Sequence, residues 1–196
     1  MKKLWAILVI CLIGAYFAWR DRPLERTPGV LAPDPPQQSA VAAPLPVFEK
    51  NGYRITPLAR FEAQARVLAK EDYYLGTEAA LAPVDLALGW GRMSDSQVLA
   101  GIAISQSHRF YYWYTETFPI PRREIETHSA NMHMIPADPN IEKQLKAVRS
   151  GAIVNLRGYL VEARRDDGRY WRSSLTRDDT GSGACELVWV EALEVN

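Results

Sequence analysis

An uncharged segment at the N-terminus, followed by a proline-rich stretch, constrains this chain more than any other feature. The 16 residues from Leu4 to Trp19 carry no charge and lie between two basic clusters. As a helix they would extend about 24 Å, against a hydrocarbon core of about 30 Å. Trp5 and Trp19 near the two ends are typical of membrane interfaces. We therefore expect residues 1–19 to be a membrane anchor, with a transmembrane helix over residues 4–19 that acts as a signal anchor.

A cleaved signal peptide is the alternative, because its apolar region is usually about 7–15 residues long. Cleavage requires small residues at alternating positions, and Tyr16 occupies the position that would pair with Ala18. The short N-terminal tail favours an N-terminus inside the cytoplasm. The sequence thus predicts a single-pass protein of the inner (cytoplasmic) membrane, whose C-terminal domain is periplasmic or otherwise extracytoplasmic.

Residues 20–47 hold seven of the 13 prolines of the chain. Proline fixes φ and disfavours helix in the residue before it, so we expect this stretch to be an extended, semi-rigid tether. The tether would join the anchor, residues 1–19, to a folded domain over residues 48–196.

The composition is that of a globular protein and excludes several classes of function. Hydrophobic residues make up 47% of the chain, enough to bury a core. Lys and Arg number 23, as do Asp and Glu, so there is no basic field and we expect no nucleic-acid partner. Cys11 lies in the uncharged segment and Cys185 near the C-terminus, so they do not form a disulfide within one domain.

Periodicity predicts an α+β domain with about three helices and a mainly antiparallel, barrel-like sheet. Residues 57–72 place apolar side chains on one helical face. A capping box over residues 94–97 predicts a short helix, and Asp138-Pro139 begins a third helix that Gly151 ends.

Strands are expected where apolar residues alternate. The segments are residues 102–105, 109–114, 152–163, 169–175 and 185–195. Asp167-Gly168 is a hairpin signal, and Gly158 fits a bend at a barrel corner. In the last strand, Leu187, Trp189, Leu193 and Val195 share one face, which we expect to be core, with Val190 on the other face.

Residues 86–95 (LALGWGRMSD), 128–136 (HSANMHMIP) and 173–189 (SSLTRDDTGSGACELVW) resemble a family of uncharacterised, single-span, membrane-anchored bacterial proteins. The resemblance covers most of residues 75–195 and implies no activity. The late strands also resemble a β-barrel of the oligonucleotide/oligosaccharide-binding (OB) type, a fold that supports many functions.

The first candidate site consists of His128, Asn131 and His133. Cys185 is a further residue of a type that binds metal ions. Residues five apart lie about 140° apart on a helix and on opposite faces of a strand, so neither geometry chelates one metal. Structural histidines or polar loop anchors are the simpler interpretation. We expect no metal and no cofactor.

Ser173, Ser174, Arg177 and Asp178 lie in a polar loop that forms the second candidate site. Its backbone N–H groups and Arg177 suit an anion, whereas Asp178 and its neighbour would repel one. Turns closed by the loop's own Asp and Ser side chains are the alternative. The aromatic run Phe110–Tyr114 is a further candidate surface, with one face in the core and the other binding a partner or glycan, or with both faces in the core.

These features favour a membrane-anchored envelope module that binds an envelope protein partner. The alternative is an envelope hydrolase or metal-dependent enzyme that uses His128, His133, Asp178 and Cys185. No spacing of an established catalytic motif distinguishes the alternative.

Overall fold

The computed structural model describes residues 5, 7, 9, 11, 12, 14, 22–43, 47–179, 181 and 183–196. The predicted transmembrane segment, residues 4–19, lies largely outside these residues. No helix among the described residues is long and apolar enough to cross a membrane. This finding contradicts the predicted transmembrane helix, the signal anchor and the single-pass location in the inner membrane. The length of the uncharged segment was the weak point of this prediction, because a helix over this segment would be about 6 Å shorter than the hydrocarbon core.

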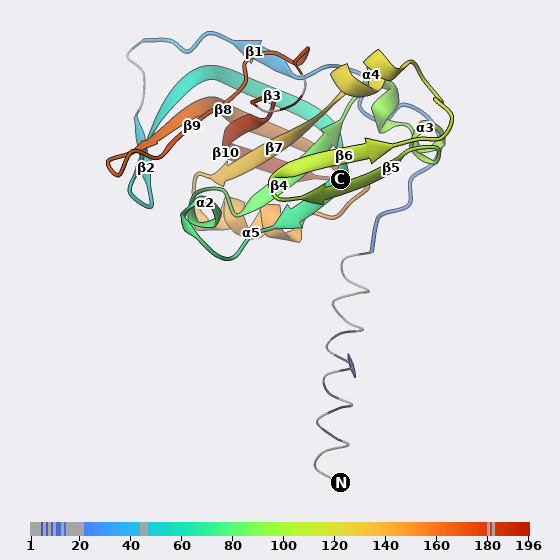
Figure 1. Cartoon of the computed structure of the whole chain (residues 1–196), viewed down its shortest axis with the longest axis horizontal. Helices are drawn as coiled ribbons and strands as arrows, with labels where there is room; N and C mark the ends of the chain where they lie inside the picture. Colours follow the sequence, from blue (N-terminus) through green and yellow to red (C-terminus); the bar gives the residue numbers. More distant parts are fainter. Residues whose placement is uncertain are drawn as a thin grey trace.

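Strands hold 43% of the described residues and helices 19%, so the domain is mainly β and the predicted α+β class is wrong. The strands are β1 (Gln37–Ser39), β2 (Phe48–Lys50), β3 (Tyr53–Asp72), β4 (Val84–Gly89), β5 (Ala103–Ser107), β6 (Phe110–Tyr114), β7 (Ser129–Pro136), β8 (Ile153–Arg165), β9 (Tyr170–Arg172) and β10 (Glu186–Val195). The helices are α2 (Thr77–Leu81), α3 (Ser96–Leu99), α4 (Arg122–Thr127) and α5 (Pro139–Ala147), with a 3₁₀ turn η1 (Gly91–Ser94) (Figure 1).

The predicted helix over residues 57–72 is instead part of β3, the longest strand. Every second residue from Tyr53 to Val67 is buried, which is the period of a strand. Ala59, Ala63 and Ala65 lie on the buried face, and alanine suits a helical stripe as well as a strand. The strand prevails because β3 hydrogen-bonds to β1, β2, β4 and β8. Pro57 lies at a register irregularity of the β3–β8 pairing, where its missing N–H is tolerated.

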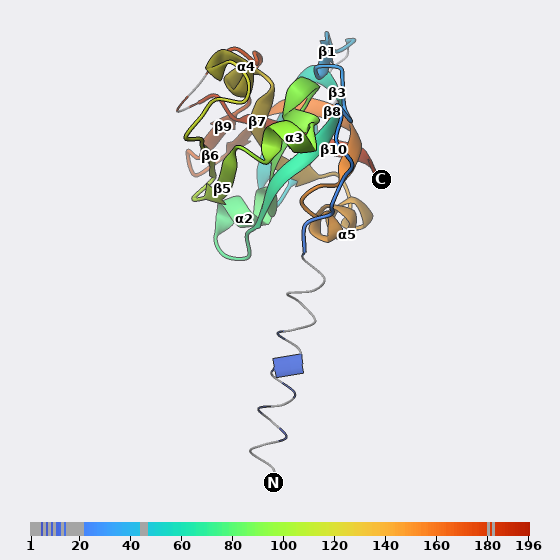
Figure 2. The same cartoon turned by 90° about the vertical axis from the view of Figure 1, so that its right-hand side faces the viewer.

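Five strands pair in a closed ring. β3 pairs with β4, β4 with β7, β7 with β10, β10 with β8, and β8 again with β3. The β7–β10 pairing is parallel and the other four are antiparallel, so the ring is a barrel (Figures 1 and 2). Its interior holds the main hydrophobic core, which includes Phe61, Leu86, Met132, Leu160 and Val188.

Helix α5 connects β7 to β8 and begins where the sequence predicts. The Asp138 carboxylate accepts hydrogen bonds from the N–H groups of Asn140 at 2.7 Å and Ile141 at 3.0 Å. Ile141 and Leu145 join the barrel core. The third predicted helix is therefore confirmed, although it ends at Ala147, before Gly151.

Strand β10 has apolar side chains on both of its faces. Leu187 and Trp189 belong to a second core outside the barrel, where Trp189 stacks on Phe48 with ring centroids 4.5 Å apart. Val190 and Leu193 belong to the interior core, because a register irregularity between Val190 and Ala192 reverses the alternation. The predicted core face is confirmed for Leu187 and Trp189; Leu193 is also core, as predicted, but on the opposite face. The prediction is wrong for Val195, which is 47% exposed.

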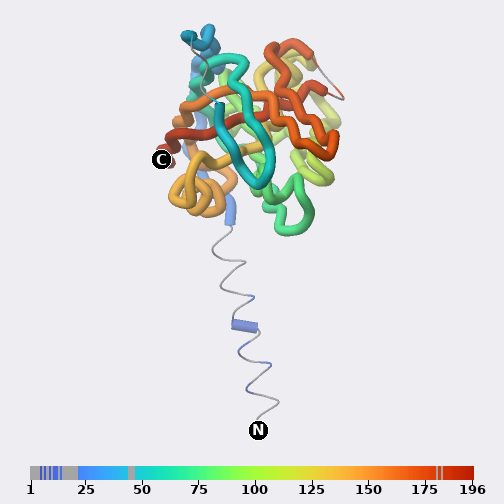
Figure 3. The backbone as a smooth tube through the Cα atoms, turned by 90° about the vertical axis from the view of Figure 1, so that its left-hand side faces the viewer, coloured from blue at the N-terminus to red at the C-terminus, as the bar shows by residue number. Residues whose placement is uncertain are grey.

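Residues 22–43 are part of the predicted tether, residues 20–47, and they lie along the barrel (Figures 2 and 3). The Leu24 N–H donates to the Ser150 carbonyl at 2.7 Å. The Ser94 hydroxyl accepts hydrogen bonds from the N–H groups of Leu31 and Ala32, both at 3.0 Å. Strand β1 pairs with β3. This segment is therefore fixed to the folded domain at several points.

The hairpin β5–β6 forms a separate two-stranded sheet within the connection from β4 to β7. Figure 1 shows it in front of β4 and β7. Gln106 of β5 donates to the Asn131 side chain of β7 at 2.6 Å, which fixes the hairpin to the barrel.

Candidate functional site

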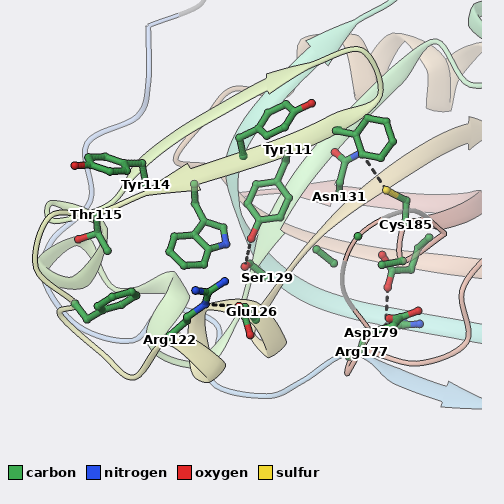
Figure 4. Close-up of a pocket in the computed structure, with 18 residues that line it drawn as sticks. Tyr111, Tyr114, Thr115, Arg122, Glu126, Ser129, Asn131, Arg177, Asp179 and Cys185 are labelled. Carbon is green, nitrogen blue, oxygen red and sulfur yellow. Dashed lines mark hydrogen bonds and ion pairs between the residues drawn. The ribbon is translucent and has the colours of Figure 1, made fainter.

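A cleft of about 670 Å³ lies between the hairpin β5–β6 and the barrel (Figure 4). It is bordered by the whole of β6, by α4, by the beginning of β7 and by residues of the segment 177–186. These four pieces are far apart in the sequence, and the barrel brings them together. A volume of this size is typical of a binding site, which usually encloses about 300–1,000 Å³.

The hairpin that borders the cleft turns at His108 and Arg109. Both residues have positive φ, 51° and 70°, and Ser107 pairs with Phe110 across the turn. This is a two-residue turn of type I′, whose twist matches that of the two strands. Neither residue is glycine, so contacts elsewhere must hold the turn in this conformation.

Arg109 fixes the tip of the hairpin to the barrel. Its Nη1 lies 2.7 Å from the Asp85 carboxylate and donates to the Ala82 carbonyl at 2.9 Å. The guanidinium lies over the Tyr73 ring, 3.6 Å from its centroid. Asp85 is fully buried, and the same carboxylate oxygen lies 2.9 Å from Nδ1 of His133. This buried network holds β6 in place before any ligand binds, which lowers the entropic cost of binding.

Alternate side chains of β6 point toward the barrel. The Tyr111 hydroxyl lies 2.5 Å from the Ser129 hydroxyl of β7. Burial raises the pKa of Tyr111 to about 12, so the phenol stays neutral at physiological pH. The Trp113 ring packs edge-on against Phe118, with centroids 6.2 Å apart, and the Arg122 guanidinium lies 5.8 Å from the Trp113 centroid.

The other side chains of β6 form a row of exposed aromatic rings. Phe110, Tyr112 and Tyr114 are 42%, 51% and 65% exposed. Their partners on β5 are small, namely Ser107, Ser105 and Ala103. The rings are therefore not covered by their cross-strand neighbours, and aromatic rings of this kind are frequent in interfaces.

A buried carboxyl group, that of Glu186, also lines the cleft. Glu186 begins β10 and is 1% exposed, and its Oε1 lies 2.8 Å from Nε of Arg177. Its Oε2 has no hydrogen-bond partner among the described residues. Burial raises the pKa of Glu186 to about 8, against the opposing effect of Arg177. A ligand that donates a hydrogen bond here would satisfy an atom that is otherwise unpaired.

The charges that line the described part of the cleft nearly balance at pH 7, because Glu186, with its pKa near 8, is largely protonated there. Arg122 pairs with Glu126 at 2.8 Å, and Arg177 pairs with Glu186. Asp179 has no cationic partner there and accepts a hydrogen bond from the Ser174 hydroxyl at 2.6 Å. The described lining of the cleft therefore carries no net basic charge.

The structure brings Asn131, Arg177 and Cys185 together in the cleft. Ser173 and Ser174 lie beside it and hold the segment: the Ser173 hydroxyl accepts the Leu187 N–H at 3.1 Å. The loop's internal turns, predicted as the alternative to an anion site, are present at Ser174, which bonds to the Thr176 carbonyl and to Asp179.

His128, His133 and Asp178 lie elsewhere. His133 is 2% exposed, faces Asp85, and lies against the Trp171 ring, with centroids 4.5 Å apart. His128 ends α4, and Asp178 is an exposed partner of Arg123. In the described part of the chain, no group of three His, Cys, Asp or Glu side chains is placed to hold a metal ion.

Sequence reasoning missed Glu126, Ser129 and Glu186 as lining residues of the cleft. The aromatic run of β6 was the one usable signal, because its alternation on a strand leaves one set of rings outside the core. Glu186 gave a weaker signal: it is a single acidic residue directly before a run of apolar residues.

Comparison of this chain with protein-family models, curated proteins and solved structures gives no match.

The thiol of Cys185 does not have the character of a nucleophile, because burial raises its pKa to about 11. The cleft is therefore best described as a preformed aromatic surface beside a buried carboxylate, which is chemistry suited to binding.

Proposed function

We propose that this domain is a binding module that holds a segment of a partner protein in the cleft beside β6. The observation that carries the proposal is the cleft itself, with an exposed aromatic row on a hairpin that Arg109 anchors. Aromatic side chains on a rigid element contribute much of the energy of protein interfaces. The predicted location of that partner in the envelope depended on the membrane anchor and is not part of the proposal.

The barrel topology supports a ligand at this position. Its order of strands, with one parallel pair and a helix before the fourth strand, is similar to an OB-type barrel. OB barrels bind ligands on the face of their second and third strands. In this chain β4 and β7 take those places, and residues of β7 line the cleft.

Charge favours a protein segment over a nucleic acid. Binding of a phosphate backbone depends on unpaired Lys and Arg side chains. Arg122 and Arg177, the arginines that line the described part of the cleft, each contact a carboxyl group, and Asp179 adds a negative charge. Exposed aromatic rings without a basic surface suit a polypeptide better.

Site-specific photocrosslinking tests the proposal in cells that produce the protein naturally. A photoreactive phenylalanine analogue at position 112 is expected to capture a discrete partner. The matched control is the analogue at position 170, because Tyr170 lies outside the cleft and is 52% exposed, against 51% for Tyr112. Equal capture at both positions would contradict the proposal.

Affinity measurements with the purified partner complete this test. Tyr112→Ala should weaken binding at least about tenfold, since interface aromatic residues often contribute more than about 1.4 kcal/mol. Tyr170→Ala should leave the affinity within about twofold of the wild type. Equal affinities for the two variants would place the partner elsewhere on the surface.

A further inference from the structure

The edge of β6 that faces away from β5 has no neighbouring strand among the described residues. In a hairpin with a two-residue turn, the pair that closes the turn is hydrogen-bonded, and the bonding alternates from there. The closing pair is Ser107 and Phe110, so Phe110, Tyr112 and Tyr114 bond to β5. The N–H and C=O groups of Tyr111 and Trp113 therefore point to the other edge.

That edge faces the cleft. The Arg109 carbonyl lies on the same edge by the same alternation, and it accepts a hydrogen bond at 2.9 Å from the side chain of Asn131, a lining residue of the cleft. No hydrogen bond to the main-chain groups of Tyr111 or Trp113 on this edge is found within the described residues. The open edge thus begins directly after the point where Asn131 occupies it.

We propose that the partner segment enters the cleft as an extended strand that hydrogen-bonds to the main chain of Tyr111 and Trp113. This inference rests on the proposed function and specifies the conformation and the chemistry of the ligand. Addition of a strand to a free sheet edge supplies affinity through the main chain, and pockets for alternate side chains supply specificity.

The alternation of a strand fixes where the partner's side chains point. Those beside Phe110, Tyr112 and Tyr114 would share the outer face with the aromatic row, so apolar side chains fit there. Those beside Tyr111 and Trp113 would point inward, toward Asn131, Asp179 and Glu186. The buried, unpaired Oε2 of Glu186 favours a hydrogen-bond-donating side chain at one inward position.

A second copy of this chain fits the edge less well. Pairing of two β6 edges would bring a second hairpin, with its barrel, into a cleft that α4 and the segment 177–186 border on other sides. A single strand of a partner needs only about 4.8 Å beyond β6. We therefore assign the edge to a separate segment of a partner protein.

The probe for this inference is a displayed library of random 12-residue linear peptides, selected on the full 196-residue chain. Peptides with alternating apolar residues and a hydrogen-bond-donating side chain at an inward position are expected. N-methylation of the selected peptide at every second residue should weaken binding at least about tenfold, because it removes the bonded N–H groups. N-methylation at the intervening residues should have a much smaller effect.

A matched pair of protein variants tests the same bond from the other side. Trp113→Pro and Trp113→Ala both remove the indole ring, but only proline removes the N–H at the open edge. Proline is tolerated on a sheet edge of this kind. Trp113→Pro should therefore bind the peptide at least about tenfold more weakly than Trp113→Ala, with Tm values compared to verify folding.

The outcomes separate this inference from the proposed function. Peptides whose binding needs Tyr112 but ignores N-methylation and Trp113→Pro would overturn the strand and leave the cleft as the binding site. Peptides that ignore Tyr112→Ala would overturn both. Failure to select any peptide, or self-association of the chain that Trp113→Pro abolishes, would also overturn the inference. If Trp113→Pro does not fold, the N-methylation series decides.

Discussion

At the scale of single residues, Glu186 makes stability depend on pH. Burial raises its pKa from 4.5 to about 8, so the folded chain binds more protons than the unfolded chain between these values. Its contribution is fully present below about pH 4.5 and is lost as the pH rises through about 8. Relative to Glu186→Gln, the wild type should lose up to about 5 kcal/mol of unfolding free energy across this range. Urea denaturation of both proteins between pH 4.5 and 9 measures this difference, and parallel curves would contradict it.

Arg109 is the second residue whose removal has a specific cost. Arg109→Ala would leave the fully buried Asp85 carboxylate without its guanidinium partner. We expect a loss of about 3–5 kcal/mol, because breaking a buried ion pair leaves an uncompensated charge. Arg164→Ala is the control and should leave the unfolding midpoint nearly unchanged, since the Arg164 side chain is exposed where it pairs with Glu162. Similar midpoints of urea unfolding for the two variants would show that the anchor contributes little.

At the scale of elements, β8 and β10 approach each other closely at Gly158. A Cβ atom at this position would lie 1.8 Å from the Trp189 carbonyl oxygen, which is main chain and cannot rotate away. Gly158→Ala should therefore cost at least about 3 kcal/mol or prevent folding. At Gly101 a Cβ would meet its nearest atom at 3.6 Å, an ordinary contact, so Gly101→Ala should change the stability by less than about 1 kcal/mol. Thermal unfolding monitored by circular dichroism compares the two.

The same elements show which features of the fold local sequence patterns can predict. The strands at residues 152–163 and 185–195 were predicted within a few residues of β8 and β10. The short helix after residue 94 is also present, with Asp95 as its N-cap, because the Ser94 hydroxyl instead bonds to Gly91 and the N-terminal segment. The alternation of each strand and the capping of the helix by Asp95 both involve residues that lie within a few positions of one another.

At the scale of the whole molecule, β10 joins two cores and two neighbouring strands. Trp189 is 7% exposed and packs outside the barrel, whereas Val190 is fully buried inside it. Trp189→Ala should cost about 3–5 kcal/mol, and Val190→Ala should cost about 2 kcal/mol. The expectation that Val190 tolerates substitution on a wet face is thus corrected. A Trp189→Ala protein that melts within about 2 °C of the wild type would refute the packing described for this strand.

The sequence by itself determined the late strands, the start of α5 and the aromatic alternation of β6, because capping and period-two patterns act over a few residues. It did not determine that residues 57–72 are a strand. Alanine at three buried positions suits either period, and the choice was made by main-chain hydrogen bonds to three strands from other parts of the chain, β1, β4 and β8. The cleft also depended on tertiary structure. Asn131, Arg177 and Cys185 were named from composition and spacing, but only closure of the barrel places them beside β6 and leaves His128 and His133 apart. Contacts between residues distant in the chain decide such positions, and no local pattern encodes them.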